Sequence, residues 1–246
     1  MKSDISSFGT NGMKAILFDL DGTLLPMQQD EFTAAYFDRL SKKLAPCGYE
    51  PERLIEGVWQ GTNAMVKNNG EQTNEQVFRK EFAGLFGDKV YSDIDKFNEF
   101  YETDFEKLKS HCGYNEQANR TIQTLKEKGF LLVLASNPVF PMTAQKKRML
   151  WAGIDPDDFV LITSYENSHY CKPNPLYYKE IAEMIGVHPS DCLMVGNDTT
   201  EDAAAMLTGT DFFLLTDCLL NKERIDISKY SRGSFVQLLT YIDDLY

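Results

Sequence analysis

The second half of the chain alternates between short apolar runs and segments whose apolar residues recur at helical spacing. The runs predict strands, and the spacing predicts helices between them. Strands that are apolar along their whole length and separated by helices are typical of a parallel sheet that helices cover on both faces. We therefore predict an α/β protein with a doubly wound parallel sheet. The predicted strands lie at 130–135, 159–163, 192–195 and 212–215, and the predicted helices at 117–128, 141–151, 175–185, 200–207 and 235–242.

Residues 28–113 lack such strand-like runs, and their apolar positions recur at helical spacing instead. Phe32, Tyr36, Leu40 and Leu44 follow one another at intervals of four, which places them on one face of a helix. We expect this stripe to be the core of a helical bundle rather than a ligand site, because helix packing alone requires such a face. The sequence thus predicts about four helices inserted between the first and second strands of the sheet.

Two sites in this helical segment have the spacing of a capping box, in which side chains three residues apart satisfy free backbone N–H groups at a helix start. They are Thr73 with Gln76, and Ser92 with Asp95. Both pairs precede apolar residues at helical spacing, so we expect a helix to begin at each.

The composition is acidic and otherwise ordinary for a globular protein. The chain has 246 residues, of which 43% are hydrophobic, and a formal net charge of -12. Binding to nucleic acid or to an anionic membrane requires clustered Lys and Arg, so we expect neither partner. An anionic substrate would need local cations or a metal ion.

Neither a targeting segment nor a membrane anchor is predicted. Residues 1–12 are polar and lack the apolar stretch of a signal peptide, and the longest apolar run, at 130–135, is too short to span a bilayer. The cysteines are odd in number and lack C-x-x-C spacing, which favours free thiols in the cytoplasm. They are Cys47, Cys112, Cys171, Cys192 and Cys218.

The D-x-D-G-T motif of residues 19–23 follows an apolar run at 15–18, which predicts one more strand. In an extended chain, side chains at i and i+2 share a face, so Asp19 and Asp21 can converge before Gly22 turns the backbone. Two carboxylates held that close need a cation or a shared proton, and strand ends of open α/β sheets bind ligands. A strand-end aspartate can also simply cap a turn, so the motif alone leaves both interpretations open.

Two later segments carry further candidates. Ser136 and Asn137 follow the strand predicted at 130–135, where a hydroxyl and backbone N–H groups can bind phosphate oxygens, although Ser-Asn-Pro is also an ordinary turn sequence. Lys172 begins the sequence Lys-Pro-Asn-Pro, which restricts the backbone before a helix. Most lysine side chains are solvated charges on the protein surface, so Lys172 is informative mainly in combination with the other candidate segments.

A fourth segment, after the strand predicted at 192–195, is acidic. Asp198, Glu201 and Asp202 fall within five residues. A helix N-terminus favours acidic side chains without any function, so this cluster also has a purely structural explanation.

In this order, the four segments resemble the four motifs of the haloacid dehalogenase-like (HAD) hydrolase superfamily: D-x-D-x-T, a Ser or Thr, a Lys, and an acidic G-D-x-x-x-D-like segment. The resemblance implies a Rossmann-like core at 13–27 and 114–246 with a helical cap inserted at 28–113. One position departs from the pattern, because Asn197 precedes Asp198 where Gly-Asp is commoner.

The resemblance also implies phosphoryl transfer through an aspartyl-phosphate formed on Asp19. Asp21 would protonate the departing alkoxide and then activate water. The cofactor would be Mg²⁺, held by the carboxylates of Asp19 and Asp198, the backbone carbonyl of Asp21, waters and the substrate phosphate. The phosphate-binding residues would be Ser136, Asn137 and Lys172, and the supporting residues Gly22, Thr23 and Asp202.

The implied substrate is a small phosphorylated metabolite, selected by the cap. The main alternative is a phosphosugar mutase, which would use the same Asp19 and Asp21 but return the phosphoryl group to a sugar. A carbon–halogen hydrolase is less favoured, because its chemistry needs neither Mg²⁺ nor an acid at Asp21. A phosphonate hydrolase would need a cap lysine that forms a Schiff base, and no lysine of the cap has an identifying context. From another class, an inactive binding protein could share the fold, but no motif residue is missing here.

Overall fold

The computed structural model describes Gly12 and residues 14–245, so the polar segment 1–12 lies outside the described residues except for Gly12. A single sheet of six parallel strands forms the centre of the fold, in the order β3-β2-β1-β4-β5-β6. This confirms the predicted α/β class and the parallel sheet. The strands are β1 (Ala15–Phe18), β2 (Leu131–Leu134), β3 (Leu161–Ile162), β4 (Cys192–Gly196), β5 (Asp211–Leu215) and β6 (Ser231–Gly233).

The central strand β1 lies between β2 and β4, and the three strands end at the same level. Phe18 pairs with Leu134 of β2 and with Val195 of β4. Beyond the strand, the backbone N–H of Asp19 donates to the carbonyl of Val195 at 2.9 Å, and that of Ala135 donates to the carbonyl of Phe18 at 2.7 Å. The loops that follow β1, β2 and β4 therefore start side by side, at the point where the strand order reverses and ligands commonly bind.

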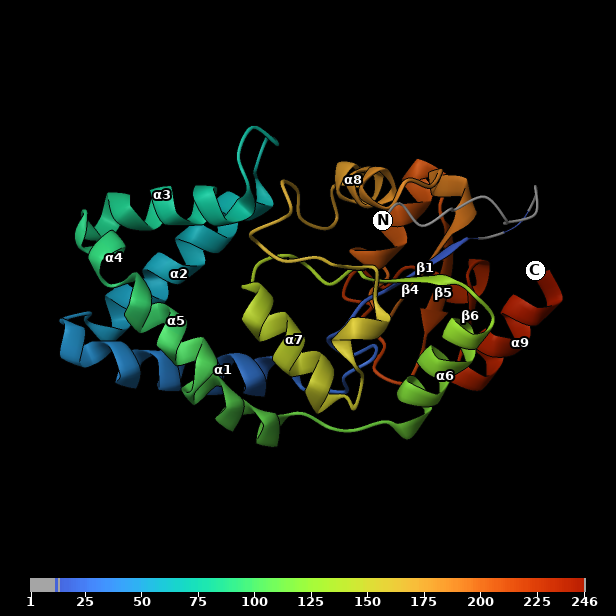
Figure 1. Cartoon of the computed structure of the whole chain (residues 1–246), viewed down its shortest axis with the longest axis horizontal. Coiled ribbons are helices and arrows are strands. Elements are labelled where there is room, and N and C mark those ends of the chain that lie inside the picture. Colours follow the sequence, from blue (N-terminus) through green and yellow to red (C-terminus); the bar gives the residue numbers. More distant parts are fainter. Residues whose placement is uncertain (1–11, 13, 246) are drawn as a thin grey trace, which may run out of the picture.

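Helices cover both faces of the sheet (Figure 1). The elements are α6 (Glu116–Glu127), α7 (Met142–Trp151), η3 (Pro156–Asp158), α8 (Pro175–Ile185), η4 (Pro189–Asp191), η5 (Asp202–Thr208), η6 (Ile227–Lys229) and α9 (Phe235–Leu245), where η denotes a 3-10 helix. Ile16 and Phe18 of β1 belong to the hydrophobic core that includes α6, α7 and α9, whereas Ala15 and Leu17 belong to the core with α8 and η5. The alternation of side chains along β1 thus joins two hydrophobic layers.

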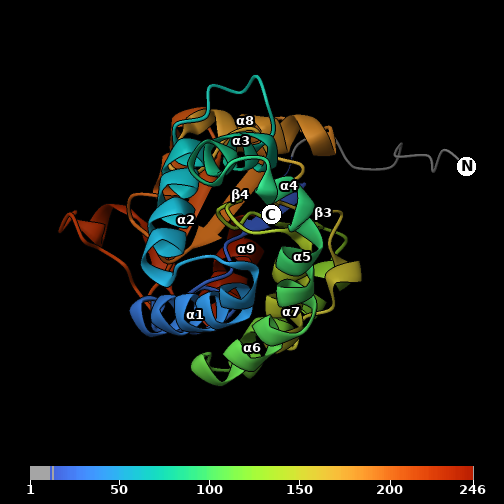
Figure 2. The same cartoon turned by 90° about the vertical axis from the view of Figure 1, so that its left-hand side faces the viewer.

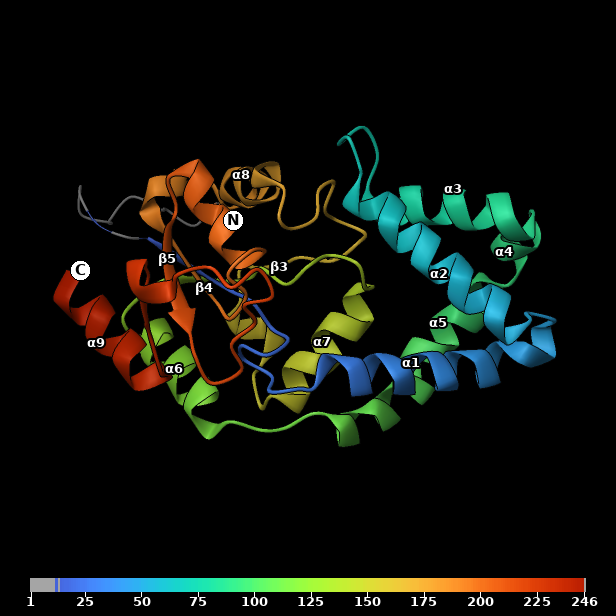
Figure 3. The same ribbon diagram turned by 180° about the vertical axis from the view of Figure 1, so that it is seen from behind.

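Residues 28–113, which lie between β1 and α6, contain helices and no strand of the sheet. We call this segment the helical insertion. It lies to one side of the sheet in Figures 1 and 3, and Figure 2 views it from that side. Its elements are α1 (Gln29–Leu44), η1 (Ala45–Cys47), α2 (Pro51–Val66), α3 (Asn74–Phe86), α4 (Lys89–Ser92), α5 (Ile94–Glu102) and η2 (Asp104–His111). The predicted apolar stripe of α1 is buried.

A helix begins close to each of the two starts predicted in the helical insertion, but only the first has a capping box. The Thr73 hydroxyl accepts the backbone N–H of Gln76, and the Gln76 side chain accepts the backbone N–H of Thr73, which is a complete capping box at α3. At the second site, helix α5 begins at Ile94, but the capping box is not formed, because Ser92 is the last residue of α4 and its hydroxyl donates to the carbonyl of Lys89 at 2.7 Å.

The chain enters and leaves the helical insertion at one place. Met27 and Cys112 form an antiparallel bridge, and the backbone N–H of Gly113 donates to the carbonyl of Pro26 at 2.6 Å. A second connection lies at the start of α3, where the backbone N–H of Asn74 donates to the carbonyl of Ser168 at 2.8 Å. This geometry supports the proposed division into a core at 13–27 and 114–246 and a cap at 28–113.

Strand β6 and the helix predicted at 200–207 differ from the sequence prediction. Strand β6 was not predicted because its sequence, Ser-Arg-Gly, is not apolar, and an edge strand that pairs only with β5 needs no apolar run. The helix predicted at 200–207 is instead the 3-10 helix η5. The residues before η5 form a turn in which Oδ1 of Asp198 accepts the backbone N–H groups of Thr200 and Glu201. Such side-chain bonds compete with the start of a regular α-helix.

The five cysteines are free thiols, as predicted. Among the residues that the structure describes, no helix is long and apolar enough to cross a bilayer.

Candidate active site

Asp19 lies directly after the central strand and is almost completely buried. Its Oδ1 accepts a hydrogen bond from Nζ of Lys172 at 2.8 Å. Its Oδ2 lies 3.0 Å from the hydroxyl of Thr23, four residues further along the same loop. The end of β1 therefore presents a fixed carboxylate that is paired with a cation, as the D-x-D-G-T motif led us to expect.

The turn after Asp19 depends on Gly22. Its φ is +84°, a left-handed conformation that favours glycine, and a Cβ at this position would lie 2.4 Å from Nδ2 of Asn197. Oδ1 of Asn197 is 3.1 Å from the Thr23 hydroxyl, which has one hydrogen and can donate to either Asn197 or Asp19. Asn197, the residue that departs from the HAD pattern, thus fastens this turn to the loop after β4.

Lys172 and Asp202 form a buried ion pair beneath Asp19. Nζ of Lys172 is 2.6 Å from Oδ1 of Asp202, and both side chains are at most 2% exposed. Burial alone would lower the pKa of Lys172, but the charges of Asp19 and Asp202 outweigh it and raise that pKa well above its usual value. The ammonium therefore carries its charge throughout the physiological pH range.

Asp202 holds a second part of the site in place. Its Oδ2 accepts the backbone N–H of Asp198 at 2.9 Å. Burial raises the pKa of Asp202 to about 7, although Lys172 opposes this shift. A Cβ on Gly196 would lie 2.1 Å from Oδ2 of Asp202, so glycine at the end of β4 leaves the space that this carboxylate occupies.

The loop after β2 brings Ser136 and Asn137 to the same edge of the sheet. Ser136 is buried, and its carbonyl accepts hydrogen bonds from the hydroxyls of Thr163 and Tyr177, both at 2.8 Å. The side-chain amide of Asn137 accepts the backbone N–H of Lys172 at 3.2 Å and donates to Glu201 at 3.2 Å. The oxygen and the nitrogen of this amide each form a hydrogen bond with a different neighbouring loop. These bonds favour a positioning role for Asn137.

The second aspartate of the motif, Asp21, is paired with a residue that the sequence did not indicate. Oδ2 of Asp21 accepts a hydrogen bond from the guanidinium of Arg148, a completely buried side chain on α7. The same guanidinium also donates to Oε1 of Gln145 and lies 4.5 Å from the centre of the Phe140 ring. Burial raises the pKa of Asp21, and the charge of Arg148 acts in the opposite direction.

One oxygen of the Asp21 carboxylate makes no hydrogen bond within the described structure. Oδ1 of Asp21 is buried and has no hydrogen-bond partner among the described residues. A buried carboxylate oxygen without a partner is costly for folding. It is therefore a candidate for contact with a ligand.

Oxygen donors at these loops suit a hard divalent cation. Asp19 and Asp198 supply carboxylates, and the loop at Asp21 supplies a backbone carbonyl, which is the donor chemistry that Mg²⁺ prefers. Within the described part of the chain, no group of three or more His, Cys, Asp or Glu side chains is arranged to hold a metal. A cation here would therefore need the carbonyl, waters and substrate oxygens in addition to the two carboxylates.

Comparisons with known proteins agree with this architecture. Residues 13–208 match the family described as haloacid dehalogenase-like hydrolase. The chain is 25% identical over 198 residues to a phosphoglycolate phosphatase of Aquifex aeolicus, covering 80% of this chain and 82% of the relative. It is 27% identical over 240 residues to a phosphoglycolate phosphatase of Vibrio vulnificus, covering 94% and 96%.

A solved structure has the same fold. The crystal structure of a predicted phosphoglycolate phosphatase from Haemophilus somnus superposes with a TM-score of 0.58 at 19% identity, covering 95% of this chain and 99% of that one. The family match extends over most of the chain and includes all four motifs. The protein therefore belongs to the haloacid dehalogenase-like hydrolases.

Proposed function

We propose that this protein is a Mg²⁺-dependent phosphomonoester hydrolase that acts on a small phosphorylated metabolite through an aspartyl-phosphate. The observation that carries the proposal is the buried arrangement of Asp19, Lys172 and Asp202 at the end of the central strand. The phosphoglycolate phosphatases among the relatives support a phosphate monoester as the substrate.

In the first step, a carboxylate oxygen of Asp19 attacks phosphorus as the bond to the ester oxygen breaks. The departing alkoxide takes a proton from Asp21, and burial favours the protonated form of Asp21 that this step needs. In the second step, Asp21 removes a proton from water, whose oxygen attacks phosphorus. The bond between phosphorus and Asp19 breaks, which releases phosphate and restores the carboxylate.

Lys172 places a positive charge at the proposed nucleophile, since its ammonium contacts Asp19. An acidic protein with a net charge of -12 repels an anionic substrate unless positive charge is concentrated at the site. The proposed roles are therefore phosphate binding by Lys172 together with Ser136, and orientation of Lys172 by Asp202. Mg²⁺ held by Asp19, Asp198 and the carbonyl of Asp21 would neutralise charge on the phosphate oxygens.

The proposal is tested by phosphate release from 4-nitrophenyl phosphate by the purified protein. We expect turnover with Mg²⁺, loss of turnover with excess EDTA, and recovery when Mg²⁺ is added back. Undiminished turnover in EDTA would contradict the metal dependence, and absence of turnover under all conditions would contradict the hydrolase assignment.

Arg148 provides a further prediction. Arg148→Met should lower kcat about 10- to 100-fold, because Asp21 loses the group that fixes its position. Arg148→Lys should recover only part of this loss, since an ammonium cannot contact Asp21 and Gln145 through one planar group. Steady-state kinetics of both variants checks this, with Arg120→Met at a more exposed ion pair as the control. An unchanged kcat in Arg148→Met would show that the pair has no part in the reaction.

A further inference from the structure

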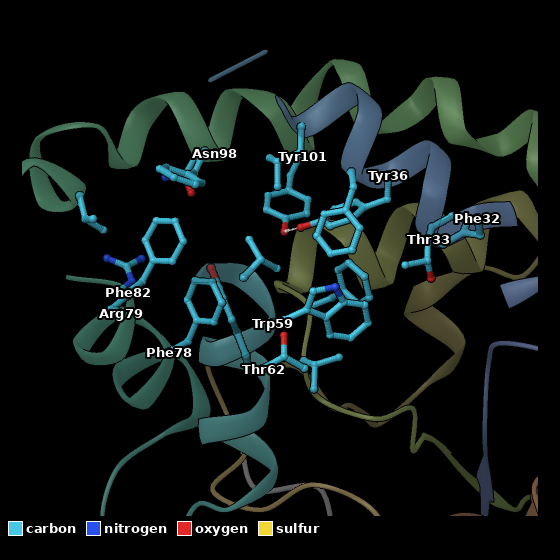
Figure 4. Close-up of a pocket in the computed structure, with 18 of the residues that line it drawn as sticks. Phe32, Thr33, Tyr36, Trp59, Thr62, Phe78, Arg79, Phe82, Asn98 and Tyr101 are labelled. Carbon is cyan, nitrogen blue, oxygen red and sulfur yellow. Dashed lines mark hydrogen bonds between the residues drawn. The ribbon is translucent and has the colours of Figure 1, made fainter. Parts of the chain in front are cut away.

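A cavity of about 260 Å³ lies in the helical insertion and reaches Asp21. Its walls come from α1, α2, α3, α4 and α5, together with Val139, Phe140 and Tyr165 of the core. In Figure 4, the rings of Trp59, Phe78 and Phe82 surround the same space. A group bound at the end of the cavity that Asp21 lines would lie next to the proposed general acid, which is where the leaving group of a phosphate ester must be placed.

The walls of the cavity are mainly apolar. Most of the residues that line it are aromatic or aliphatic. Two of the aromatic residues, Trp59 and Tyr91, are 48% and 51% exposed. Large apolar side chains that line a cavity and remain open to solvent are typical of a binding site.

Three polar residues of the wall, Tyr36, Tyr101 and Arg79, bond to other protein groups. The hydroxyls of Tyr36 and Tyr101 lie 2.9 Å apart and bond to each other, and burial raises the pKa of Tyr36 to about 12, so this pair is neutral. Arg79 is the one positively charged residue among the described residues that line the cavity. It forms an ion pair with Glu75, one turn earlier on α3. A carboxylate in the buried part of the cavity would lose hydration, and among the described lining residues it would meet no cation that lacks an ionic partner.

Two rings of the aromatic wall pack closely against the backbone of α2. A Cβ on Gly61 would lie 2.5 Å from the ring of Phe78, and one on Gly57 would lie 3.0 Å from the ring of Phe82. Because both positions are glycine, the two rings pack directly against the backbone of α2, which holds them in place. Rings that are held by packing lose little freedom when a ligand binds, so the cost of ordering them is small.

Assuming the proposed phosphatase function, we propose that this cavity binds the leaving group and that the substrates are phosphate monoesters of bulky, uncharged alcohols. A cavity of 260 Å³ lies just below the usual range for drug-sized ligands, and it suits an alcohol with about one or two rings. The leaving group of phosphoglycolate is smaller and carries a carboxylate, so it fits neither the size nor the charge of this site.

The test compares kcat/KM for three phosphate esters of primary alcohols, namely 2-phenylethyl phosphate, ethyl phosphate and phosphoglycolate. Burial of one phenyl ring should make kcat/KM about 10- to 100-fold higher for 2-phenylethyl phosphate than for ethyl phosphate. Phosphoglycolate should be a poorer substrate than 2-phenylethyl phosphate. In Trp59→Ala, the ratio of the phenylethyl to the ethyl value should fall about 10-fold. In Tyr114→Ala, which removes an exposed ring outside the cavity, the ratio should stay as in the unaltered protein.

A second measurement does not depend on turnover. Calorimetry of 2-phenylethyl phosphate binding to Asp19→Asn should give a more negative heat capacity change than ethyl phosphate, because more apolar surface is buried. Equal heat capacity changes, a preference for phosphoglycolate, or a ratio unaffected by Trp59→Ala would each overturn the inference while leaving the phosphatase function in place. Failure to hydrolyse all three esters, with the calorimetric difference present, would overturn the proposed function and retain the apolar site.

Discussion

Asp19→Asn is expected to lower kcat by about four orders of magnitude or more, because an amide oxygen cannot replace the carboxylate as nucleophile. The geometry of the site should survive. Oδ1 of Asp19 accepts a hydrogen bond from Lys172, and the amide oxygen of asparagine can accept the same bond. The loss of activity should therefore come from the chemistry rather than from a displaced loop.

The stability of this variant separates it from a folding defect. Asp19 and Asp202 are two buried carboxylates that share the single ammonium of Lys172. Neutralising Asp19 leaves one carboxylate with one ammonium, which removes repulsion between like charges. We expect Asp19→Asn to unfold at the same temperature as the unaltered protein or slightly above it, as is common when a strained active site is relieved.

Steady-state phosphate release and thermal unfolding check both statements. Asp38→Asn is a suitable control, because Asp38 lies on the exposed face of α1 in an ion pair with Lys42 and should affect neither measurement. Intact-mass analysis excludes conversion of the introduced asparagine back to aspartate. A normal turnover rate in Asp19→Asn would remove the aspartyl-phosphate from the mechanism.

The strands that could be predicted from sequence are those whose signal is local. β1, β2, β4 and β5 are buried along most of their length, so apart from Asp211 at the start of β5 their positions carry no polar side chain, and the run itself marks the strand. The helix predicted at 175–185 coincides with α8, whose start is set by Asn174 and Pro175. β6 carries no such signal, because its register comes from hydrogen bonds to β5 rather than from its own side chains.

The candidate site was predictable for the residues in motifs and not for their long-range partners. Asp19 follows a strand, Lys172 begins a restricted turn and Asp202 lies in the acidic segment after β4, and the structure brings them within hydrogen-bond distance. Arg148 lies in an ordinary basic helix segment, and its contact with Asp21 spans 127 residues. Sequence patterns describe one element at a time, so a contact that depends on how α7 packs beside β1 leaves no local signal.

The cavity shows a related limit. The stripe at Phe32 and Tyr36 was predicted to be bundle core, and both residues are buried in the hydrophobic core. The same two residues also line the cavity. Periodicity identifies the face of a helix that turns inward, but whether that face meets another side chain or an unfilled space depends on the packing of five helices.

Lys172→Met is expected to destabilise the protein by about 3–5 kcal/mol and to abolish turnover, because it leaves Asp19 and Asp202 buried without their cation. Lys172 is 1% exposed, so solvent cannot replace the lost charge. Methionine preserves most of the apolar stem, and the free energy lost should therefore be mainly electrostatic. Denaturant unfolding gives the stability change, and phosphate release from the folded variant gives the change in activity.

The double variant Lys172→Met with Asp202→Asn separates the structural role of the lysine from its chemical role. Asp202→Asn alone keeps Lys172 paired with Asp19 and should cost less than Lys172→Met. Combining the two removes one of the two unpaired buried charges, so the double variant should be more stable than Lys172→Met, with a coupling free energy of about 1–3 kcal/mol. Its turnover should remain absent, because the phosphate still lacks the ammonium. If stability and turnover instead return together, Lys172 acts only by supporting the fold. If stability returns alone, the lysine is needed at the reacting centre itself.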